Sequence, residues 1–275
     1  MDKIIEINNL TKNYGNHRGV TDVSLCVNKG DVFGFLGPNG AGKSTTIRSM
    51  LGLINFTQGE IRICGMDVRK KHREILQRIG YMPSECWFYQ GTTVLEILKM
   101  SAAARQIQCD EYRNFLCEKL NLDVSRKISE LSLGNRKKVS VVCAMQHRPE
   151  LLIFDEPTSG LDPLIQKNFF ELIYSAVDDG ATCLLSTHVL SEVRTNCNRV
   201  AIMKEGKVLC TDTVENLTRA NSKRIKGLVD GESVDYLFSG DYQKLFSELS
   251  THDISDISIE EPSMEEIFMH YYGGK

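Results

Sequence analysis

The chain has 275 residues and a formal net charge of −3, so it lacks the strongly basic surface that binds nucleic acid phosphates. Its length favours one large domain plus a small appendage, with 41% apolar and 25% charged residues as in globular proteins. Nine cysteines without a Cys-x-x-Cys pair fit a reducing cytosol, and the lack of a secretion signal or an 18-residue apolar run predicts a chain that does not cross a membrane alone.

The first part of the chain reads as short strands followed by a helix. Strands are predicted at residues 4–7, 19–27 and 32–36, and the last of these is apolar throughout, as in a buried strand. A glycine-rich loop follows, and then a helix is predicted from apolar residues at helical spacing, which are Ile47, Met50, Leu51 and Ile54. The local order is therefore strand, loop, helix.

The pattern turns helical over about residues 85–146. Apolar residues recur three or four apart over residues 94–104, 110–120 and 134–146, which predicts three helices. We interpret this part of the chain as a helical insertion.

Two more buried strands are predicted at residues 151–154 and 182–185, with a helix over about residues 163–177 between them. Strands joined by a helical crossover pair in parallel, so the sequence predicts a three-layer α/β core. Weaker strand and helix signals follow, and we expect residues 218–275 to form a small C-terminal extension.

Residues 37–44 satisfy the phosphate-binding pattern G-x-x-x-x-G-K-S between a strand and a helix. Such a loop lets backbone N–H groups converge on phosphate oxygens at the positive end of the helix. Lys43 is expected to bind the β- and γ-phosphates of a nucleotide and Ser44 a magnesium ion; an ordinary glycine-rich turn is the alternative. The expected nucleotide-binding residues of this loop are Gly37, Pro38, Asn39, Gly40, Ala41, Gly42, Lys43, Ser44 and Thr45.

Two carboxylates, Asp155 and Glu156, end the apolar strand at residues 151–154. Ligands gather at this end of parallel strands, so we expect Asp155 to hold magnesium and Glu156 to polarise an attacking water. For either acid alone, a helix cap or a solvated strand end is the alternative. His188 follows another apolar strand and, taken alone, is more often a structural histidine at a strand end; its position relative to the other motifs favours a role in the site. Ser132 precedes a predicted helix, where capping is the simpler role.

Together, the ordered motifs at residues 37–44, 131–135, 151–156, 159–162 and His188 resemble the ATP-binding subunit of ABC transporters. The resemblance covers about residues 3–217, and the expected ATP-binding domain is residues 1–217. It implies a three-layer P-loop NTPase core with an antiparallel β subdomain, a helical insertion and a small α+β C-terminal extension.

The resemblance also implies roles for individual residues. Ser132 and Gly134 belong to the family signature, which contacts ATP held by the opposing subunit of a head-to-tail dimer, either a homodimer or a heterodimer with a related ATPase. Tyr14 is expected to stack on adenine rather than serve only in packing, and His188 to contact the γ-phosphate and the attacking water. Asp162 is included among the nucleotide-binding residues.

Two segments depart from the family pattern. Ser84 followed by Glu85 stands where glutamine is usual, and Leu133 and Asn135 replace a glycine and a glutamine of the signature. Ser132 and Gly134 are kept. Because the set Lys43, Asp155, Glu156 and His188 is complete, we predict a site that hydrolyses ATP.

A cluster of aromatic residues lies where the family receives a short helix of its membrane partner. We expect a coupling loop here, whose residues are Ser84, Glu85, Trp87, Phe88 and Tyr89; core packing of the aromatic side chains is the alternative. The tail, residues 262–268 followed by His270-Tyr271-Tyr272, resembles that of bacterial exporter ATPases with a separately encoded permease, a group that includes antibiotic and bacteriocin-peptide exporters.

The predicted function is therefore an ATPase that uses ATP and Mg²⁺ to power export through transmembrane permease subunits. It is expected to lie on the cytoplasmic face of the cell membrane, held there by the permease. The alternative is an ATP-dependent dimerising switch that acts on a non-transport partner. Nucleic acid is not expected as a partner.

Overall fold

The computed structural model describes residues 2–15, 17–219, 222–239 and 241–260. The tail that resembles exporter ATPases, residues 262–272, lies outside the described residues. The chain divides into two compact units, Met1–Thr211 and Asp212–Lys275. Within the described residues, every helix is too short or too polar to cross a membrane.

The first sheet is antiparallel, with the strand order β2-β1-β4-β5. Its strands are β1 (Lys3–Tyr14), β2 (His17–Asn28), β4 (Gln58–Ile63) and β5 (Met66–Asp67). The first two strands are longer than the segments expected at residues 4–7 and 19–27. Several register shifts interrupt their pairing, and each shift breaks the alternation by which a strand is recognised in a sequence.

The second sheet has six strands in the order β10-β9-β3-β8-β7-β6. They are β3 (Val32–Leu36), β6 (Ile79–Met82), β7 (Leu151–Asp155), β8 (Thr182–Thr187), β9 (Arg199–Lys204) and β10 (Lys207–Thr213). The predicted parallel pairing of β7 and β8 is confirmed, and β3 lies between β8 and β9, parallel to both. The carboxyl ends of three motif-bearing strands therefore share one edge.

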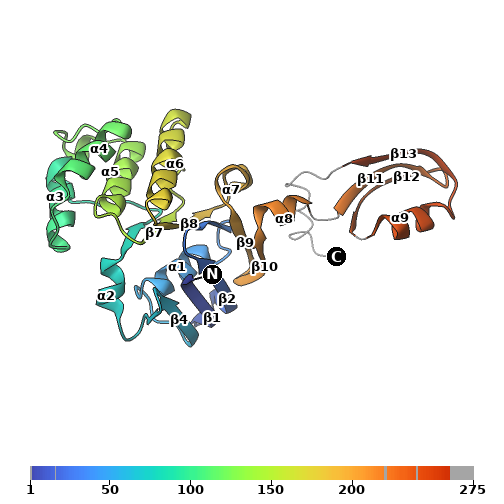
Figure 1. The fold of residues 1–275 in the computed structure, drawn as a ribbon, viewed down its shortest axis with the longest axis horizontal. Coiled ribbons are helices and arrows are strands. Elements are labelled where there is room, and N and C mark those ends of the chain that lie inside the picture. Colours follow the sequence, from blue (N-terminus) through green and yellow to red (C-terminus); the bar gives the residue numbers. More distant parts are fainter. Residues whose placement is uncertain (1, 16, 220–221, 240, 261–275) are drawn as a thin grey trace. The chain divides into compact units, whose positions relative to one another are not determined.

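Alternation along the strands of the second sheet assigns its two faces. Ile153 joins the core cluster that the second sheet forms with the first sheet and α1 (Lys43–Met50). The next residue, Phe154, points to the opposite face, where its ring packs edge-on against Phe169 of α6 (Pro163–Asp178) at 5.0 Å. Helices thus cover the second sheet on both sides, which gives the expected three-layer core (Figure 1).

The insertion between β6 and β7 is helical, as predicted. It contains α3 (Val94–Ala104), α4 (Asp110–Lys119), the 3₁₀ turn η1 (Ile128–Glu130) and α5 (Leu133–Met145), and α2 (His72–Gln77) precedes it. Thr93 starts α3 with a capping box, in which its hydroxyl accepts from the Glu96 N–H and the Glu96 carboxylate accepts from the Thr93 N–H. The helices α3, α4 and α5 lie together in the green part of Figure 1.

The C-terminal unit is a small α+β module. It contains α8 (Val214–Arg219), β11 (Ser222–Val229), β12 (Glu232–Ser239), α9 (Tyr242–Leu249) and β13 (Ile254–Glu260). The three strands form an antiparallel sheet in the order β12-β11-β13. Ile225 of β11 packs with Leu245 and Leu249 of α9, so this unit has a core of its own.

Candidate functional site

The candidate site forms where β3, β8 and β7 end. Leu36 at the end of β3 pairs with Thr187 of β8, and Ser186 of β8 pairs with Asp155 at the end of β7. The glycine-rich loop follows β3, His188 follows β8, and Glu156 follows β7. Motifs that are more than a hundred residues apart in the chain therefore meet at one edge of the sheet.

The glycine-rich loop leads into α1 through Gly42, which has a φ of 107°. A Cβ at this position would also lie 2.7 Å from a methyl carbon of Val20, so only glycine fits. Beside the loop lies a cavity of about 270 Å³, lined by Gly19, Asn39, Gly40, Gly42, Lys43, Ser44, Thr45 and Glu156. Predicted loop residues and the predicted catalytic glutamate thus line one cavity.

Lys43 is the buried cation of this cavity, with 4% of its surface exposed. Its ammonium donates to the carbonyl oxygens of Gly37 at 2.6 Å and Pro38 at 3.2 Å, and it lies 3.5 Å from Oε1 of Glu156. Burial lowers the pKa of Lys43, while the nearby carboxylates of Glu156 and Asp155 oppose this shift. A buried ammonium at the N-terminal end of α1 is suited to polyanionic phosphate.

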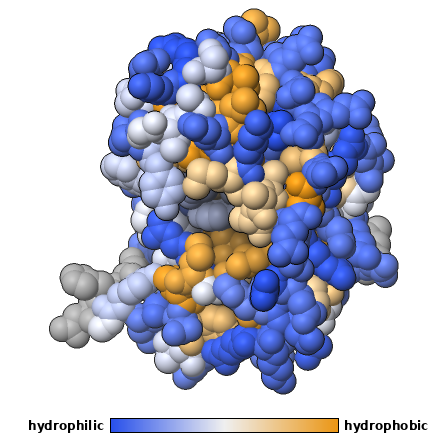
Figure 2. Space-filling view, turned by 90° about the vertical axis from the view of Figure 1, so that its left-hand side faces the viewer, coloured by the Kyte–Doolittle hydropathy of each residue, from blue (hydrophilic) through white to orange (hydrophobic). Residues whose placement is uncertain are grey.

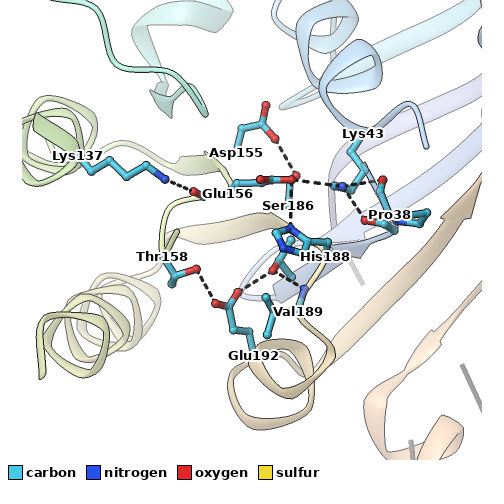
Figure 3. Close-up of polar contacts among 12 residues, drawn as sticks. Pro38, Lys43, Lys137, Asp155, Glu156, Thr158, Ser186, His188, Val189 and Glu192 are labelled. Atoms are coloured by element: carbon cyan, nitrogen blue, oxygen red, sulfur yellow. Dashed lines mark hydrogen bonds and ion pairs between the residues drawn. The ribbon is translucent and has the colours of Figure 1, made fainter. Parts of the chain in front are cut away.

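Glu156 is held at the centre of the site (Figure 3). Its Oε1 lies 3.5 Å from Lys43 Nζ and 3.4 Å from His188 Nδ1, so one carboxylate oxygen faces both predicted partners. Glu156 has a φ of 51°, in the left-handed region that residues other than glycine rarely adopt and that is frequent at active sites. Its own carbonyl oxygen accepts from Nζ of Lys137, a buried lysine of α5, at 2.7 Å.

Asp155 precedes Glu156 and is fully buried at the end of β7. Its Oδ1 accepts from the hydroxyl of Ser186 on β8 at 2.7 Å. The other oxygen, Oδ2, is buried and has no hydrogen-bond partner among the described residues. Because an unpartnered buried carboxylate oxygen is costly, Asp155 fits a position that meets a cation.

Seven predicted nucleotide-binding residues lie outside the lining of this cavity, namely Gly37, Pro38 and Ala41 of the loop together with Tyr14, Ser132, Gly134 and Asp162. Tyr14, at the end of β1, is 40% exposed, with Lys12 Nζ 5.0 Å from the centre of its ring. Ser132 and Gly134 lie at the start of α5, where the Ser132 hydroxyl caps the helix by accepting from the Asn135 N–H. Asp162 caps α6 by accepting from the Ile165 N–H. The chain therefore brings together part of the predicted set.

The segment with the expected coupling loop follows β6. Trp87 is 78% exposed and Tyr89 71% exposed, which contradicts core packing for these two rings. Phe88 is half-buried, and Cys86 is the buried residue of the segment. The Trp87 indole N–H donates to Oε2 of Glu85 at 3.3 Å.

Three residues at the site carry contacts that sequence reasoning missed. Lys137 lies in the run Arg136-Lys137-Lys138, which has the composition of a solvated helix face, and no sequence signal marks it as buried. Ser186 and Thr158 are common polar residues that stand next to motif positions. Their adjacency to His188 and Glu156 is the only signal by which sequence reasoning finds them.

Comparisons with known proteins identify the family of the chain. The family model described as ABC transporter matches residues 20–159. The bacitracin transport ATP-binding protein BcrA of Bacillus licheniformis is 34% identical, in an alignment that covers 100% of this chain and 99% of that protein. The probable multidrug ABC transporter ATP-binding protein YbhF of Escherichia coli K12 is 34% identical over 78% of this chain, which spans 38% of its length.

Solved structures give the same result for the fold. A structure described as the ATP binding subunit of an ABC transporter has a TM-score of 0.74 and 31% identity, and covers 78% of this chain and 92% of its own. The dimeric cassette MJ0796 has a TM-score of 0.70 at 23% identity, with coverage of 76% and 98%. This chain belongs to the ABC transporter family and is an ATP-binding, ATP-hydrolysing subunit of it.

Proposed function

We propose that the cavity at the glycine-rich loop binds the phosphates of ATP and that Glu156 and His188 carry the hydrolysis. Lys43 and the backbone of residues 37–45 hold the phosphates, Glu156 accepts a proton from the attacking water, and His188 orients that water and the γ-phosphate. One observation carries this assignment: Glu156 Oε1 lies within 3.5 Å of both Lys43 Nζ and His188 Nδ1, at the rim of the cavity. Hydrolysis then depends on positioning and on charge stabilisation.

The residues at this edge also fit a magnesium ion that accompanies ATP. The buried Asp155 Oδ2 lacks a partner, and the hydroxyl-bearing Ser44 lines the cavity close to Lys43 in the chain. Oxygen donors of this kind are the ligands Mg²⁺ prefers, and it commonly uses one carboxylate together with substrate phosphates. We assign Ser44 and Asp155 as the residues that hold the ion. When bound, it neutralises the charge that develops on the phosphate oxygens.

Each complete site is shared between two subunits in this proposal. Ser132 and Gly134 lie outside the cavity lining, yet Ser132 is exposed at the start of α5 and Leu133 beside it is 56% exposed. A helix N-terminus presents N–H groups to an anion. A second chain that faces this helix start with its own cavity would complete the site, as a homodimer or with a related ATPase. The residues Tyr14 and Asp162 belong to the same proposal.

The partner in the membrane is proposed to dock on the exposed aromatic loop. Trp87, Phe88 and Tyr89 border a groove of about 580 Å³ whose other lining residues are Ile97, Met100, Ser101 and Cys143. The side of the molecule that carries α3 has patches of apolar side chains among hydrophilic ones (Figure 2). An apolar groove with exposed aromatic rings fits a short helix of a permease subunit, with Ser84 and Glu85 beside it.

Export is the proposed direction of transport, and the cytoplasmic face of the membrane the proposed location. The similarity to the bacitracin transport protein covers the whole chain, including the C-terminal unit, which supports a role with a separate permease. The experiment is affinity purification of the full chain from detergent-solubilised membranes. A co-eluting multi-span protein is the expected result, and its loss when Trp87 and Tyr89 are replaced by alanine ties it to the loop. Elution with only soluble proteins contradicts the proposal.

A further inference from the structure

Glu192, a residue of α7 (Leu190–Asn196), joins the turns that follow β7 and β8 (Figure 3). Its Oε1 accepts from the hydroxyl of Thr158 at 2.5 Å, and its Oε2 accepts from the hydroxyl of Thr187 at 2.7 Å. Thr158 lies two residues after Glu156, and Thr187 lies one residue before His188. One carboxylate therefore connects the two segments that carry the proposed catalytic pair.

Both threonines depend on this carboxylate. Thr158 is 4% exposed and Thr187 2% exposed, so bulk water does not reach their hydroxyl groups. A buried hydroxyl without a partner is costly, and a hydrogen bond to a charged carboxylate is stronger than one between neutral groups. Both hydrogen bonds to Glu192, from Thr158 and from Thr187, are therefore costly to break.

The link extends to the backbone around His188. The Thr187 hydroxyl, which donates to Glu192, also accepts from the Val189 N–H at 3.0 Å. The Thr187 hydroxyl therefore ties together the residues on either side of His188 and connects both to Glu192. Its own side chain is 45% exposed, with Nδ1 3.4 Å from Glu156 Oε1. A ring with so much exposure has little packing to hold it, so its place depends on the backbone beneath it.

Glu192 does not act on ATP directly. It is absent from the lining of the cavity at the glycine-rich loop, and each of its carboxylate oxygens is occupied by a threonine hydroxyl. Its main-chain oxygen accepts from the Asn196 side chain at 2.9 Å, which fixes it within α7. Its effect on hydrolysis is therefore indirect, and the two threonines that its carboxylate holds are its contacts with the segments of Glu156 and His188.

We propose that Glu192 is a positioning residue that sets the distance between Glu156 and His188 by clamping the turn after β7 to the turn after β8. This inference rests on the catalytic roles proposed for those two residues. Displacement of a catalytic group by about 1 Å costs on the order of 10²-fold in rate, so loss of the clamp is expected to lower kcat. Binding of ATP to the glycine-rich loop does not involve Glu192, so KM should change little.

The test compares Glu192→Ala with Glu192→Gln in the purified full chain at varied Mg-ATP. A glutamine keeps the length of the side chain, and its amide accepts from one threonine hydroxyl and donates to the other. We expect Glu192→Ala to lower kcat roughly 10- to 100-fold with KM within about 3-fold of wild type. Glu192→Gln should restore most of the lost kcat. Wild-type kcat in Glu192→Ala overturns the proposal.

Val193→Ala is the matched control for a purely structural effect. Val193 is the next residue of α7 and is fully buried, so this variant loosens the same helix without touching the threonines. Its melting temperature should fall while kcat, measured well below that temperature, stays near wild type. If Val193→Ala lowers kcat as much as Glu192→Ala, Glu192 has only a structural role and the proposal fails.

A combination with His188→Ala identifies the route. If Glu192 acts by placing His188, adding Glu192→Ala to His188→Ala should cause little further loss of kcat, whereas multiplying losses contradict this route. Glu156→Gln in the same assay distinguishes failure of the proposed function from failure of the clamp proposal. Wild-type turnover in Glu156→Gln refutes the proposed function itself. Low turnover in Glu156→Gln together with normal turnover in Glu192→Ala refutes only the clamp.

Discussion

Replacement of Glu156 by glutamine is the most direct perturbation of the site, because the structure separates its effect on stability from its effect on rate. A glutamine has the same shape and keeps an oxygen that accepts from Lys43, 3.5 Å away. What it loses is the charge of a side chain that is 25% exposed. Because the partner Lys43 is buried, this loss leaves its ammonium with only Asp155 as a nearby compensating carboxylate. We expect a cost of roughly 1 to 3 kcal/mol and a fall in melting temperature of several degrees.

The rate effect is expected to be larger. An amide cannot accept the proton of the attacking water, and loss of a general base typically costs about 10²- to 10⁴-fold in kcat, or roughly 3 to 5 kcal/mol of transition-state stabilisation. ATP binding should persist because Lys43 and the glycine-rich loop are unchanged. Bound but unhydrolysed ATP should then hold two chains together, and light scattering should report twice the 31.0 kDa mass of one chain.

Glu171→Gln is the control for this experiment. Glu171 lies on the exposed side of α6, where Lys167 forms a long ion pair with it at 3.9 Å. Its replacement should therefore leave both rate and mass unchanged. Two results refute the reasoning about Glu156. One is a kcat of Glu156→Gln within a few-fold of wild type, and the other is a monomeric mass at saturating Mg-ATP.

Four further changes have expected outcomes. Lys43→Ala should weaken ATP binding at least about 100-fold in a direct titration, because the buried ammonium makes charge-assisted contacts, and unchanged affinity contradicts its phosphate role. Lys137→Met should lower kcat about 10-fold by releasing the Glu156 carbonyl oxygen, and wild-type kcat argues against this contact. Alanine at both Trp87 and Tyr89 should leave ATPase activity and melting temperature unchanged but reduce co-purification of the permease; a fall in melting temperature of several degrees makes them packing residues. Burial lowers the pKa of His147 from 6.5 to about 4, so between these pH values the unfolded chain binds one proton more than the folded chain and stability falls as pH falls. His147→Gln should reduce the dependence of the melting temperature on pH over this range, and an unchanged dependence contradicts the assignment.

The sequence predicts the central strands well because they are buried on both faces. Residues 32–36, 151–154 and 183–185 are runs without a polar side chain, and each lies in a strand of the second sheet with every residue buried. The glycine-rich loop is equally readable, because its glycines and its lysine are required by local geometry and charge. In these segments one physical requirement decides the residue type.

The strands of the first sheet were harder to predict for a specific reason. Asn9 and Asp22 both have a positive φ, and the pairing of β1 with β2 changes register near them. Each irregularity shifts the alternation of apolar and polar residues, so two 12-residue strands appear as shorter fragments in the sequence. The short strand β6 was missed because its four residues give too few positions for any periodicity.

The supporting contacts of the site depend on tertiary structure and leave no local signal. Lys137 lies in a basic run, yet it reaches the carbonyl of Glu156, 19 residues further along the chain. Glu192 looks like an ordinary acidic residue in the first turn of a helix. Its partner Thr158 is 34 residues away. Only the order of the strands in the sheet brings these groups within hydrogen-bond distance.

That strand order also explains why His188 needs support. In the sheet, β8 lies between β3 and β7, so the turn that carries His188 emerges between the glycine-rich loop and the turn of Glu156. This order lets one oxygen of Glu156 face both Lys43 and His188. Lys43 is fixed by burial and Glu156 by Lys137, whereas the His188 side chain is 45% exposed. The least packed member of the group therefore gains the most from a clamp at the base of its turn, and Glu192 occupies that position.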